Sequence, residues 1–267
     1  MEVITFTAIK GGVGKTTLTF NFANWLARKN KKVLLIDLDH QCNLTTLFEQ
    51  TRKNNTIAEI FKEEKNEDVL INNVAKNIDL IAGYLDLDDI ANKLEGNSNK
   101  EMLLYLWIRR NFETFNLEKY DYILIDTHPD FSTITKNAIA ISDYLISPIT
   151  PSEHGYNAKF DLETRLEKFR KEIFNYETGE TYIDAKLYFV ANMVKHNTST
   201  SHDLLKHIEN DKNVLDFIPE KELFNKASTQ HLSIFDLEEQ NDSLKRKNID
   251  FYNKIDNVFS KIAEINN

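Results

Sequence analysis

A glycine-rich run of eight residues, KGGVGKTT at 10–17, constrains the fold of this chain more than any other feature. It follows an apolar run with the pattern of a strand, Val3–Ala8, and it opens a segment with helical spacing, Thr16–Asn30. Glycines let the backbone curl so that successive N–H groups point at one anion, and the start of the following helix adds its positive dipole end. This order of elements predicts a phosphate-binding loop.

Strand-like runs alternate with segments of helical spacing along the rest of the chain. The further predicted strands are Val33–Asp37, Ile78–Ala82, Tyr122–Asp126, Tyr144–Ile149, Leu187–Met193 and Val214–Ile218, and the further predicted helices are Lys100–Phe115, Ser132–Ile141, Asn157–Phe174, Ser199–Glu209 and Leu244–Ile265. This alternation predicts one α/β domain over residues 1–267, with a mostly parallel, twisted central sheet and helices on both faces. Residues Gln50–Lys76, rich in Asn, Lys and Glu, are expected to form a solvated loop or helical excursion.

Composition excludes several classes of protein. Cys42 is the one cysteine, so a disulfide within the chain and a zinc or iron–sulfur site built from several of its own cysteines are excluded. No apolar run approaches the roughly 20 residues that span a bilayer, and the N-terminus lacks the pattern of a signal peptide, so we expect a cytoplasmic protein. The net charge of −9 disfavours, without excluding, binding to nucleic acid, because local clusters of basic residues decide such binding.

Two lysines in the glycine-rich run have different expected roles. Lys15 is expected to contact the β- and γ-phosphates of a nucleotide, and the hydroxyl of Thr16 is expected to complete a Mg²⁺ shell. The backbone of the loop and of the first helical turn is expected to bind the phosphates, at positions Gly11, Gly12, Val13, Gly14, Lys15, Thr16 and Thr17. Lys10 precedes the glycine pair, from where it either stays in its own site or reaches across a dimer interface.

Three acidic residues follow predicted buried strands. Asp37 and Asp39 end one strand and Asp126 ends another, which is where ligands bind in open α/β sheets. Carboxylates there can hold Mg²⁺ and position an attacking water, although Asp37 and Asp39 could instead cap a helix. His40 and His128 are both expected near the phosphates, but two histidines without a third ligand are weak evidence for a transition-metal site, so Mg²⁺ is the expected ion.

These motifs resemble the ParA/MinD family of P-loop ATPases, whose deviant Walker A motif reads KGGVGKT followed by Thr or Ser. The resemblance implies a P-loop NTPase fold, ATP and Mg²⁺ as cofactors, and a signature lysine, Lys10, that contacts the nucleotide of the partner subunit. It also implies that Asp37 supports the metal and a switch segment, that Asp39 orients the hydrolytic water, and that Asp126 is the Walker B acid. His40 and His128 stand where the family usually has proline, and Cys42 stands where it usually has glycine. These departures concern the geometry of the loops and the rate of ATP hydrolysis, not nucleotide binding.

The resemblance extends to the later part of the chain, up to about residue 235. It implies that Asn192, at the end of a predicted strand, and Pro219, in an Ile-Pro loop, lie beside the adenine, although an asparagine there is also an ordinary turn residue. Because the first strand begins at about residue 2, we expect the short type of ParA, without an N-terminal helix-turn-helix domain.

The function implied by this resemblance is that of a ParA-type ATPase for DNA segregation. ATP would drive formation of a sandwich homodimer, the dimer would bind DNA without sequence preference, and a ParB-like centromere-binding partner would stimulate slow hydrolysis. Such a protein is cytoplasmic and associates with the nucleoid when ATP is bound. The candidate DNA contacts are the basic residues Lys195, Lys221, Lys226, Lys245, Arg246 and Lys247.

Two alternatives remain open. A MinD-like positioning ATPase would bind membrane through a C-terminal amphipathic helix, and an apolar stripe with helical spacing is present there, at Ile255, Val258, Phe259, Ile262 and Ile265. The same stripe is equally typical of a last helix that packs on the core. A metabolic relative is less well supported, since the nitrogenase iron protein needs two cysteines from each subunit and no motif for the substrate pocket of a synthase is present.

Overall fold

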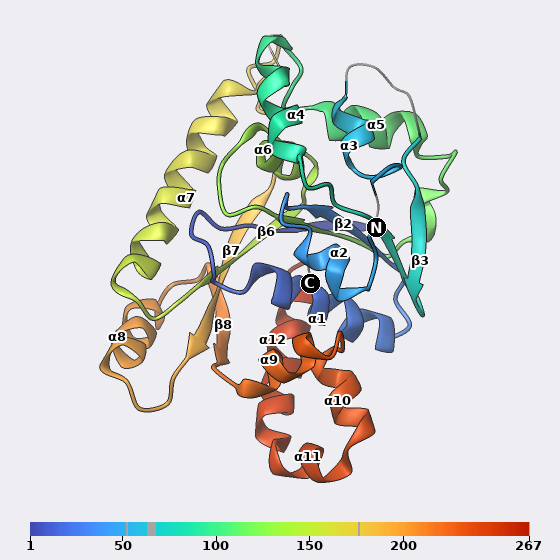
Figure 1. Cartoon of the computed structure of the whole chain (residues 1–267). Coiled ribbons are helices and arrows are strands. Elements are labelled where there is room, and N and C mark those ends of the chain that lie inside the picture. The colour runs from blue at the N-terminus through green and yellow to red at the C-terminus, as the bar shows by residue number, and fades with distance from the viewer. Residues whose placement is uncertain (52, 63–67, 176, 267) are drawn as a thin grey trace.

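The structure is a computed structural model of the chain and describes residues 1–51, 53–62, 68–175 and 177–266 (Figure 1). The strands are β1 (Glu2–Phe6), β2 (Val33–Leu38), β3 (Ile71–Ala75), β4 (Ile78–Ile81), β5 (Tyr122–Thr127), β6 (Tyr144–Ile149), β7 (Lys186–Val194) and β8 (Val214–Pro219). The α-helices are α1 (Lys15–Arg28), α2 (Asn43–Leu47), α3 (Ala58–Phe61), α4 (Leu87–Lys93), α5 (Leu103–Asn111), α6 (Thr133–Ile141), α7 (Glu153–Glu172), α8 (Ser199–Ile208), α9 (Glu222–Thr229), α10 (Ile234–Gln240), α11 (Asp242–Lys247) and α12 (Ile249–Ala263).

The described strands form one eight-stranded sheet in the order β3-β4-β2-β5-β1-β6-β7-β8. All neighbouring pairs are parallel except β3 and β4, which are antiparallel. The predicted α/β fold with a mostly parallel sheet is therefore confirmed. Because β1, β2 and β5 are parallel neighbours, the loops that follow them emerge at the same edge of the sheet, where ligands bind in folds of this type.

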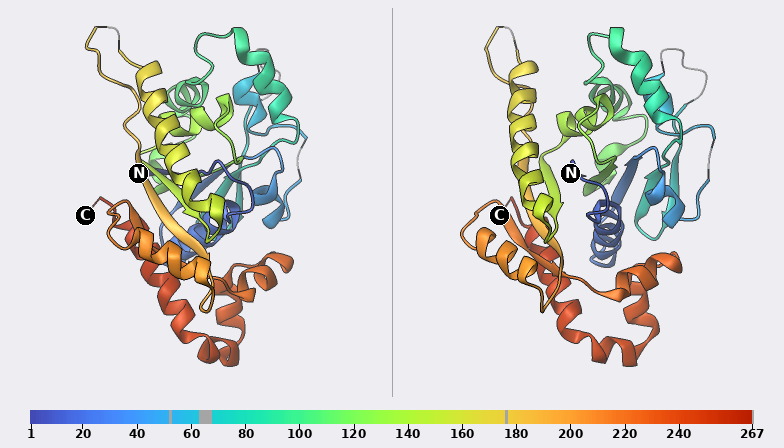
Figure 2. Two further views of the ribbon diagram at one scale, coloured as in Figure 1. Left: turned by 90° about the vertical axis from the view of Figure 1, so that its left-hand side faces the viewer. Right: turned by 60° about the vertical axis from the view of Figure 1, so that its left-hand side comes forward.

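Helices cover both faces of the sheet, as Figures 1 and 2 show. Along β2, Val33 and Leu35 face the cluster that includes α1, α10 and α12, whereas Leu34 and Ile36 face the cluster that includes α3, α5 and α6. Side chains alternate between the faces of a strand, so a strand covered on both sides needs a continuous apolar run. The run VLLI in β2 meets this requirement.

The structure corrects two predictions. The segment Gln50–Lys76, predicted as a solvated loop or helical excursion, contains the short helix α3 but also the edge strand β3, which was not predicted. Residues 52 and 63–67 of this segment lie outside the described residues. β3 lies at the edge of the sheet, pairs only with β4 and is half-buried. Its sequence INNVA therefore lacks the continuous apolar run of an inner strand. The predicted helix Leu244–Ile265 is divided at Asn248, which has φ of −123° and ends α11 before α12 begins.

Candidate functional site

The loop between β1 and α1 has the curled conformation expected of a phosphate-binding loop. Gly12 and Gly14 have φ of +72° and +93°, in the region that L side chains rarely adopt. A Cβ atom on Gly14 would also lie 2.4 Å from Asn192 Nδ2, which donates a hydrogen bond of 2.8 Å to the carbonyl of Val13. Position 14 therefore requires glycine because of both its backbone conformation and the close approach of Asn192.

The N-terminus of α1 opens onto a cavity of about 370 Å³. No side chain caps this end of the helix, and its first turn has no acidic residue. This cavity, called the phosphate cavity below because it adjoins the predicted phosphate-binding loop, is lined by that loop and the start of α1, by the segments that follow β2 and β5, and by Met193 near the end of β7. The lining residues are Gly12, Gly14, Lys15, Thr16, Thr17, Asp39, Gln41, Asn43, His128, Pro129 and Met193. An uncapped helix N-terminus with a buried lysine beside it favours binding of an anion.

Lys15, Thr16 and Asp126 lie together at the base of this site. Thr16 Oγ1 donates a hydrogen bond of 2.6 Å to Asp126 Oδ2, and Asp126 Oδ1 is buried without a hydrogen-bond partner among the described residues. Burial, followed by the charge of Asp37, raises the pKa of Asp126 well above its usual value. Burial also lowers the pKa of Lys15, against the raising effect of Asp126, Asp39 and Asp130. A free carboxylate oxygen next to a threonine hydroxyl fits a hard cation such as Mg²⁺.

Asp37 is fully buried and holds the loop after β2 in place. Its Oδ2 accepts hydrogen bonds from the backbone N and the Oγ1 of Thr45, at 2.9 and 2.6 Å, and its Oδ1 accepts one of 3.1 Å from the backbone N of Asp39. Burial raises the pKa of Asp37 to about 6, although these hydrogen bonds lower it. Since both oxygens of Asp37 already accept hydrogen bonds, Asp126 has the freer oxygen for a metal ion.

Cys42 occupies the position where the family pattern has glycine, and it keeps the conformation that glycine favours there, with φ of +52°. Burial raises the pKa of its thiol to about 12, so the thiol is protonated at neutral pH. The side chain is therefore a neutral, buried group in the segment that follows β2.

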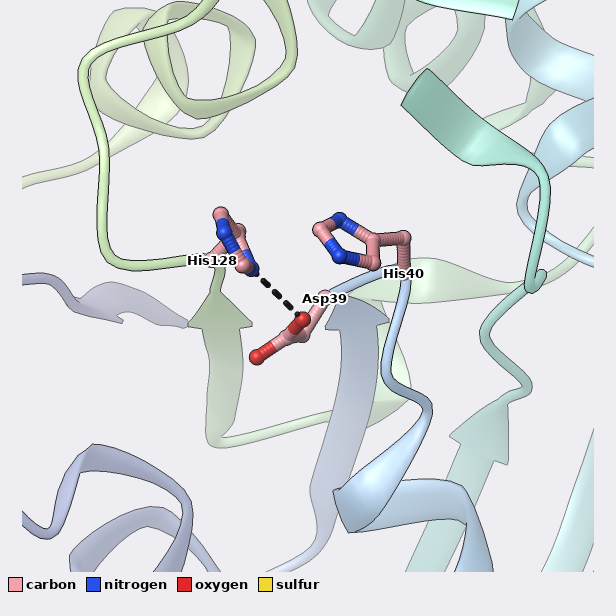
Figure 3. Close-up of side chains that lie close together, drawn as sticks. All are labelled: Asp39, His40 and His128. Carbon is pink, nitrogen blue, oxygen red and sulfur yellow. Dashed lines mark hydrogen bonds and ion pairs between the residues drawn. The ribbon is translucent and has the colours of Figure 1, made fainter. Parts of the chain in front are cut away.

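Asp39, His40 and His128 lie close together (Figure 3), and Asp39 and His128 also line the phosphate cavity. Asp39 Oδ1 accepts a hydrogen bond of 2.9 Å from the backbone N of Gln41 and lies 3.0 Å from His128 Nδ1. The rings of His40 and His128 have centroids 4.0 Å apart. The sequence indicated that both histidines lie near the phosphates, and the structure places them against each other and beside Asp39.

Lys10 is held away from the phosphate loop in this single chain. Its Nζ donates a hydrogen bond of 3.1 Å to Ser152 Oγ, in the loop before α7, and Lys10 is not among the described residues that line the phosphate cavity. No motif in the sequence pointed to Ser152, because the two residues lie 142 positions apart and meet only through the pairing of β1 with β6.

A second cavity of about 440 Å³ adjoins the first and shares Gly14, Thr17 and Met193 with it. Asn192 and Pro219, the two residues predicted beside a base, both line this second cavity, together with Phe224 and Asn225. Met193 was not predicted as part of the site, and its φ of +56° has no signal in the sequence. The two cavities form one elongated cleft at the carboxyl edge of the sheet.

The candidate DNA contacts do not form one cluster. Lys195 and Lys221 both line a third cavity, and Lys195 lies 3.5 Å from Glu220 Oε2. Lys226 lies on α9, whereas Lys245, Arg246 and Lys247 form the last turn of α11, at the lower end of the molecule in Figure 1. Lys245 also pairs with Glu238 at 3.4 Å.

The apolar stripe of the last helix packs on the core. Ile255, Val258 and Phe259 are 0% exposed and Ile262 is 1% exposed, within the cluster that α12 shares with α1. The apolar stripe that favoured a membrane-binding helix is therefore buried in the core of this structure. Among the described helices, none combines the length and apolar character that crossing a membrane requires.

The comparisons with known proteins agree with this geometry. A family model described as an AAA domain, AAA_31, matches residues 1–177. A crystallised plasmid partition protein from Borrelia burgdorferi is 31% identical, and the match covers 88% of this chain and 97% of that protein, with a TM-score of 0.68. The chain belongs to the ParA family. The predicted resemblance is thereby confirmed.

Two further relatives support this assignment. A Borrelia burgdorferi B31 structure, described as that of a candidate plasmid partition protein bound to AMPPNP, is 29% identical, covers 98% of both chains and has a TM-score of 0.76. A virulence plasmid ParA family protein of Chlamydia psittaci is 32% identical over 154 residues, which are 57% of this chain and 58% of that protein. The match to the first curated relatives spans between 46% and 60% of their length.

Proposed function

We propose that this ParA-family protein is a Mg²⁺-dependent ATPase that acts in DNA segregation. The observation that carries the proposal is the hydrogen bond of 2.6 Å between Thr16 and Asp126, directly below the uncapped start of α1. It joins the phosphate loop to the acid at the end of β5, which are the two halves of a magnesium–nucleotide site in P-loop proteins. The AMPPNP bound to the relative from Borrelia burgdorferi supports ATP as the ligand.

In this proposal each part of the cleft has a distinct task. The backbone of residues 11–17 and the ammonium of Lys15 bind the phosphates, while Asn192 and Pro219 flank the adenine in the adjoining cavity. Thr16 and Asp126 would hold Mg²⁺, with Asp37 behind them, and the ion would supply positive charge to neutralise the phosphates. Asp39 lines the phosphate cavity and orients the hydrolytic water there, as the resemblance implies.

Lys10 is proposed to link nucleotide binding to dimerisation. In the single chain Lys10 is held by one hydrogen bond to a serine, which costs little to break because a net hydrogen bond is worth about 1 kcal/mol. Release from Ser152 lets the ammonium reach the phosphates of a second copy in a sandwich homodimer. The dimer binds DNA without sequence preference, and a ParB-like partner stimulates hydrolysis, which removes the contact with the γ-phosphate and separates the dimer.

Binding of a fluorescent ATP analogue, titrated with Mg²⁺, tests the nucleotide site. Thr16→Ala removes the hydroxyl that contacts Asp126, so it is expected to raise the Mg²⁺ concentration needed for half-maximal binding and to slow hydrolysis. Thr200→Ala, on the exposed side of α8, is the matched control and should leave both unchanged. An unchanged Mg²⁺ requirement in Thr16→Ala contradicts the proposed magnesium site.

A further inference from the structure

Two parallel strands bring the ligand-type side chains of Asp39, His40 and His128 to one point. β2 and β5 are neighbours with Leu38 aligned with Thr127, so the residues that follow each strand emerge side by side. One possible ligand atom from each of the three side chains lies within 4.8 Å of those of the other two. Figure 3 shows the two imidazoles above the carboxylate, with His128 directed at Asp39.

We propose that these three residues form a binding site for a divalent transition-metal ion of the zinc type, separate from the magnesium site at Thr16 and Asp126. Two imidazole nitrogens and one carboxylate oxygen are typical ligands of zinc and its neighbours, whereas Mg²⁺ prefers oxygen ligands alone. Four-coordinate zinc with bonds of roughly 2.1 Å places its ligand atoms about 3.4 Å apart. The three side chains therefore need only small rotations to enclose an ion.

The surroundings of His40 support this site independently. His40 Nδ1 is buried and makes no hydrogen bond within the described part of the chain, although it lies 3.0 Å from Asp88 Oδ2. A carboxylate beside one ring nitrogen is the usual outer partner of a metal-bound histidine, because it orients the ring and makes the other nitrogen a better ligand. His128 faces Asp39 directly: its Nδ1 lies 3.0 Å from Asp39 Oδ1, which is close to the separation of two ligand atoms on one ion.

The charges around the site also suit a divalent cation. Two neutral imidazoles and the Asp39 carboxylate leave a bound Zn²⁺ with one net positive charge, which Asp88 offsets. The imidazoles of His40 and His128 are 19% and 28% exposed, so an ion can enter without unfolding the site. Three protein ligands leave a fourth position for water or a phosphate oxygen, and Asp39 and His128 line the cavity in which the phosphates are proposed to bind.

The consequence rests on the proposed role of Asp39 in hydrolysis. A zinc ion that binds the Asp39 carboxylate withdraws it from the water that it orients. Zinc is therefore expected to inhibit ATP hydrolysis while nucleotide binding, which depends on Lys15, Thr16 and Asp126, continues. Zinc binding at the two histidines and Asp39 would then make the rate of ATP hydrolysis depend on the zinc concentration.

Metal binding is measured first, on nucleotide-free full-length protein stripped of metal, so that ATP does not compete for zinc. Zn²⁺ is titrated against a chromophoric chelator in excess Mg²⁺, and Co²⁺ is added separately to record visible absorption bands. We expect one tight zinc per chain, and an affinity at least about tenfold lower in His40→Ala and in His128→Ala. His202→Ala, an exposed histidine on α8, is the matched control and should bind as the unaltered protein does.

Two outcomes separate this inference from the proposed function. Equal zinc affinity in the unaltered protein, His40→Ala and His128→Ala, with all three folded by circular dichroism, overturns the metal site. Hydrolysis is then measured in zinc-buffered solution with saturating Mg-ATP, where zinc should inhibit the unaltered protein and not His128→Ala. Tight zinc binding without inhibition supports the metal site but overturns the proposed inhibition by zinc and the role of Asp39 in hydrolysis. Failure of ATP binding contradicts only the proposed function.

Discussion

Replacement of Gly14 by alanine should destabilise the protein more than the same replacement at Gly12. Both positions have positive φ, so each alanine costs about 1–2 kcal/mol of backbone strain. A Cβ at position 12 meets nothing within 4 Å, whereas at position 14 it lies 2.4 Å from Asn192 Nδ2. Asn192 must then move and release the buried carbonyl of Val13, which adds about 1–3 kcal/mol.

Urea unfolding of nucleotide-free protein, followed by tryptophan fluorescence, measures these costs. We expect Gly12→Ala to lower the free energy of unfolding by about 1–2 kcal/mol and Gly14→Ala by about 2–5 kcal/mol. In an Asn192→Ala background the cost of Gly14→Ala should fall to that of Gly12→Ala, because the steric conflict is gone. Equal costs at both glycines, and no coupling to position 192, would refute the reasoning.

Further expectations concern stability. Asn21→Ala should lower the free energy of unfolding by about 1–3 kcal/mol, because it leaves the buried backbone N–H of Ile234 without its acceptor, Asn21 Oδ1. Asn24→Ala should cost less, since it removes only a hydrogen bond within α1. Similar urea midpoints for the two variants would contradict this expectation. Burial raises the pKa of Asp216, but hydrogen bonds from Lys254 and Lys261 lower it overall, so the folded chain binds fewer protons there than the unfolded chain. The loss in Asp216→Asn should therefore be full above about pH 4 and shrink as pH falls through the lowered pKa; a loss independent of pH contradicts it.

The phosphate loop and the central sheet could be predicted because their signals are local. The run 10–17 lies in one stretch of sequence, and the apolar runs of β2 and β5 reflect burial on both faces. The proximity of Thr16 and Asp126 could be predicted because ligands bind at the carboxyl ends of parallel strands, where both residues lie. β3 could not be predicted in the same way, because an edge strand with one paired side tolerates the polar sequence INNVA.

Contacts that depend on loop geometry could not be predicted from the sequence. The bond between Lys10 and Ser152 joins two loops with no shared motif, and the approach of Asn192 to Gly14 depends on a backbone torsion. The division of the last predicted helix at Asn248 is similar, because asparagine is tolerated in helices and here its non-helical φ of −123° ends α11. The sequence predicted that His40 and His128 lie near the expected phosphate site, but it did not predict that their rings contact each other, because that contact depends on how two separate loops are placed.

Binding to a non-specific DNA duplex at fixed salt, with ATP and Mg²⁺, with ADP or without nucleotide, tests the central claim most directly. The account predicts binding only with ATP, and its loss in Lys10→Ala although that variant still binds the nucleotide. Lys168→Ala, an exposed lysine on α7, should behave as the unaltered protein does. Equal DNA binding in all three nucleotide states, or ATP-dependent binding that survives in Lys10→Ala, would contradict the account.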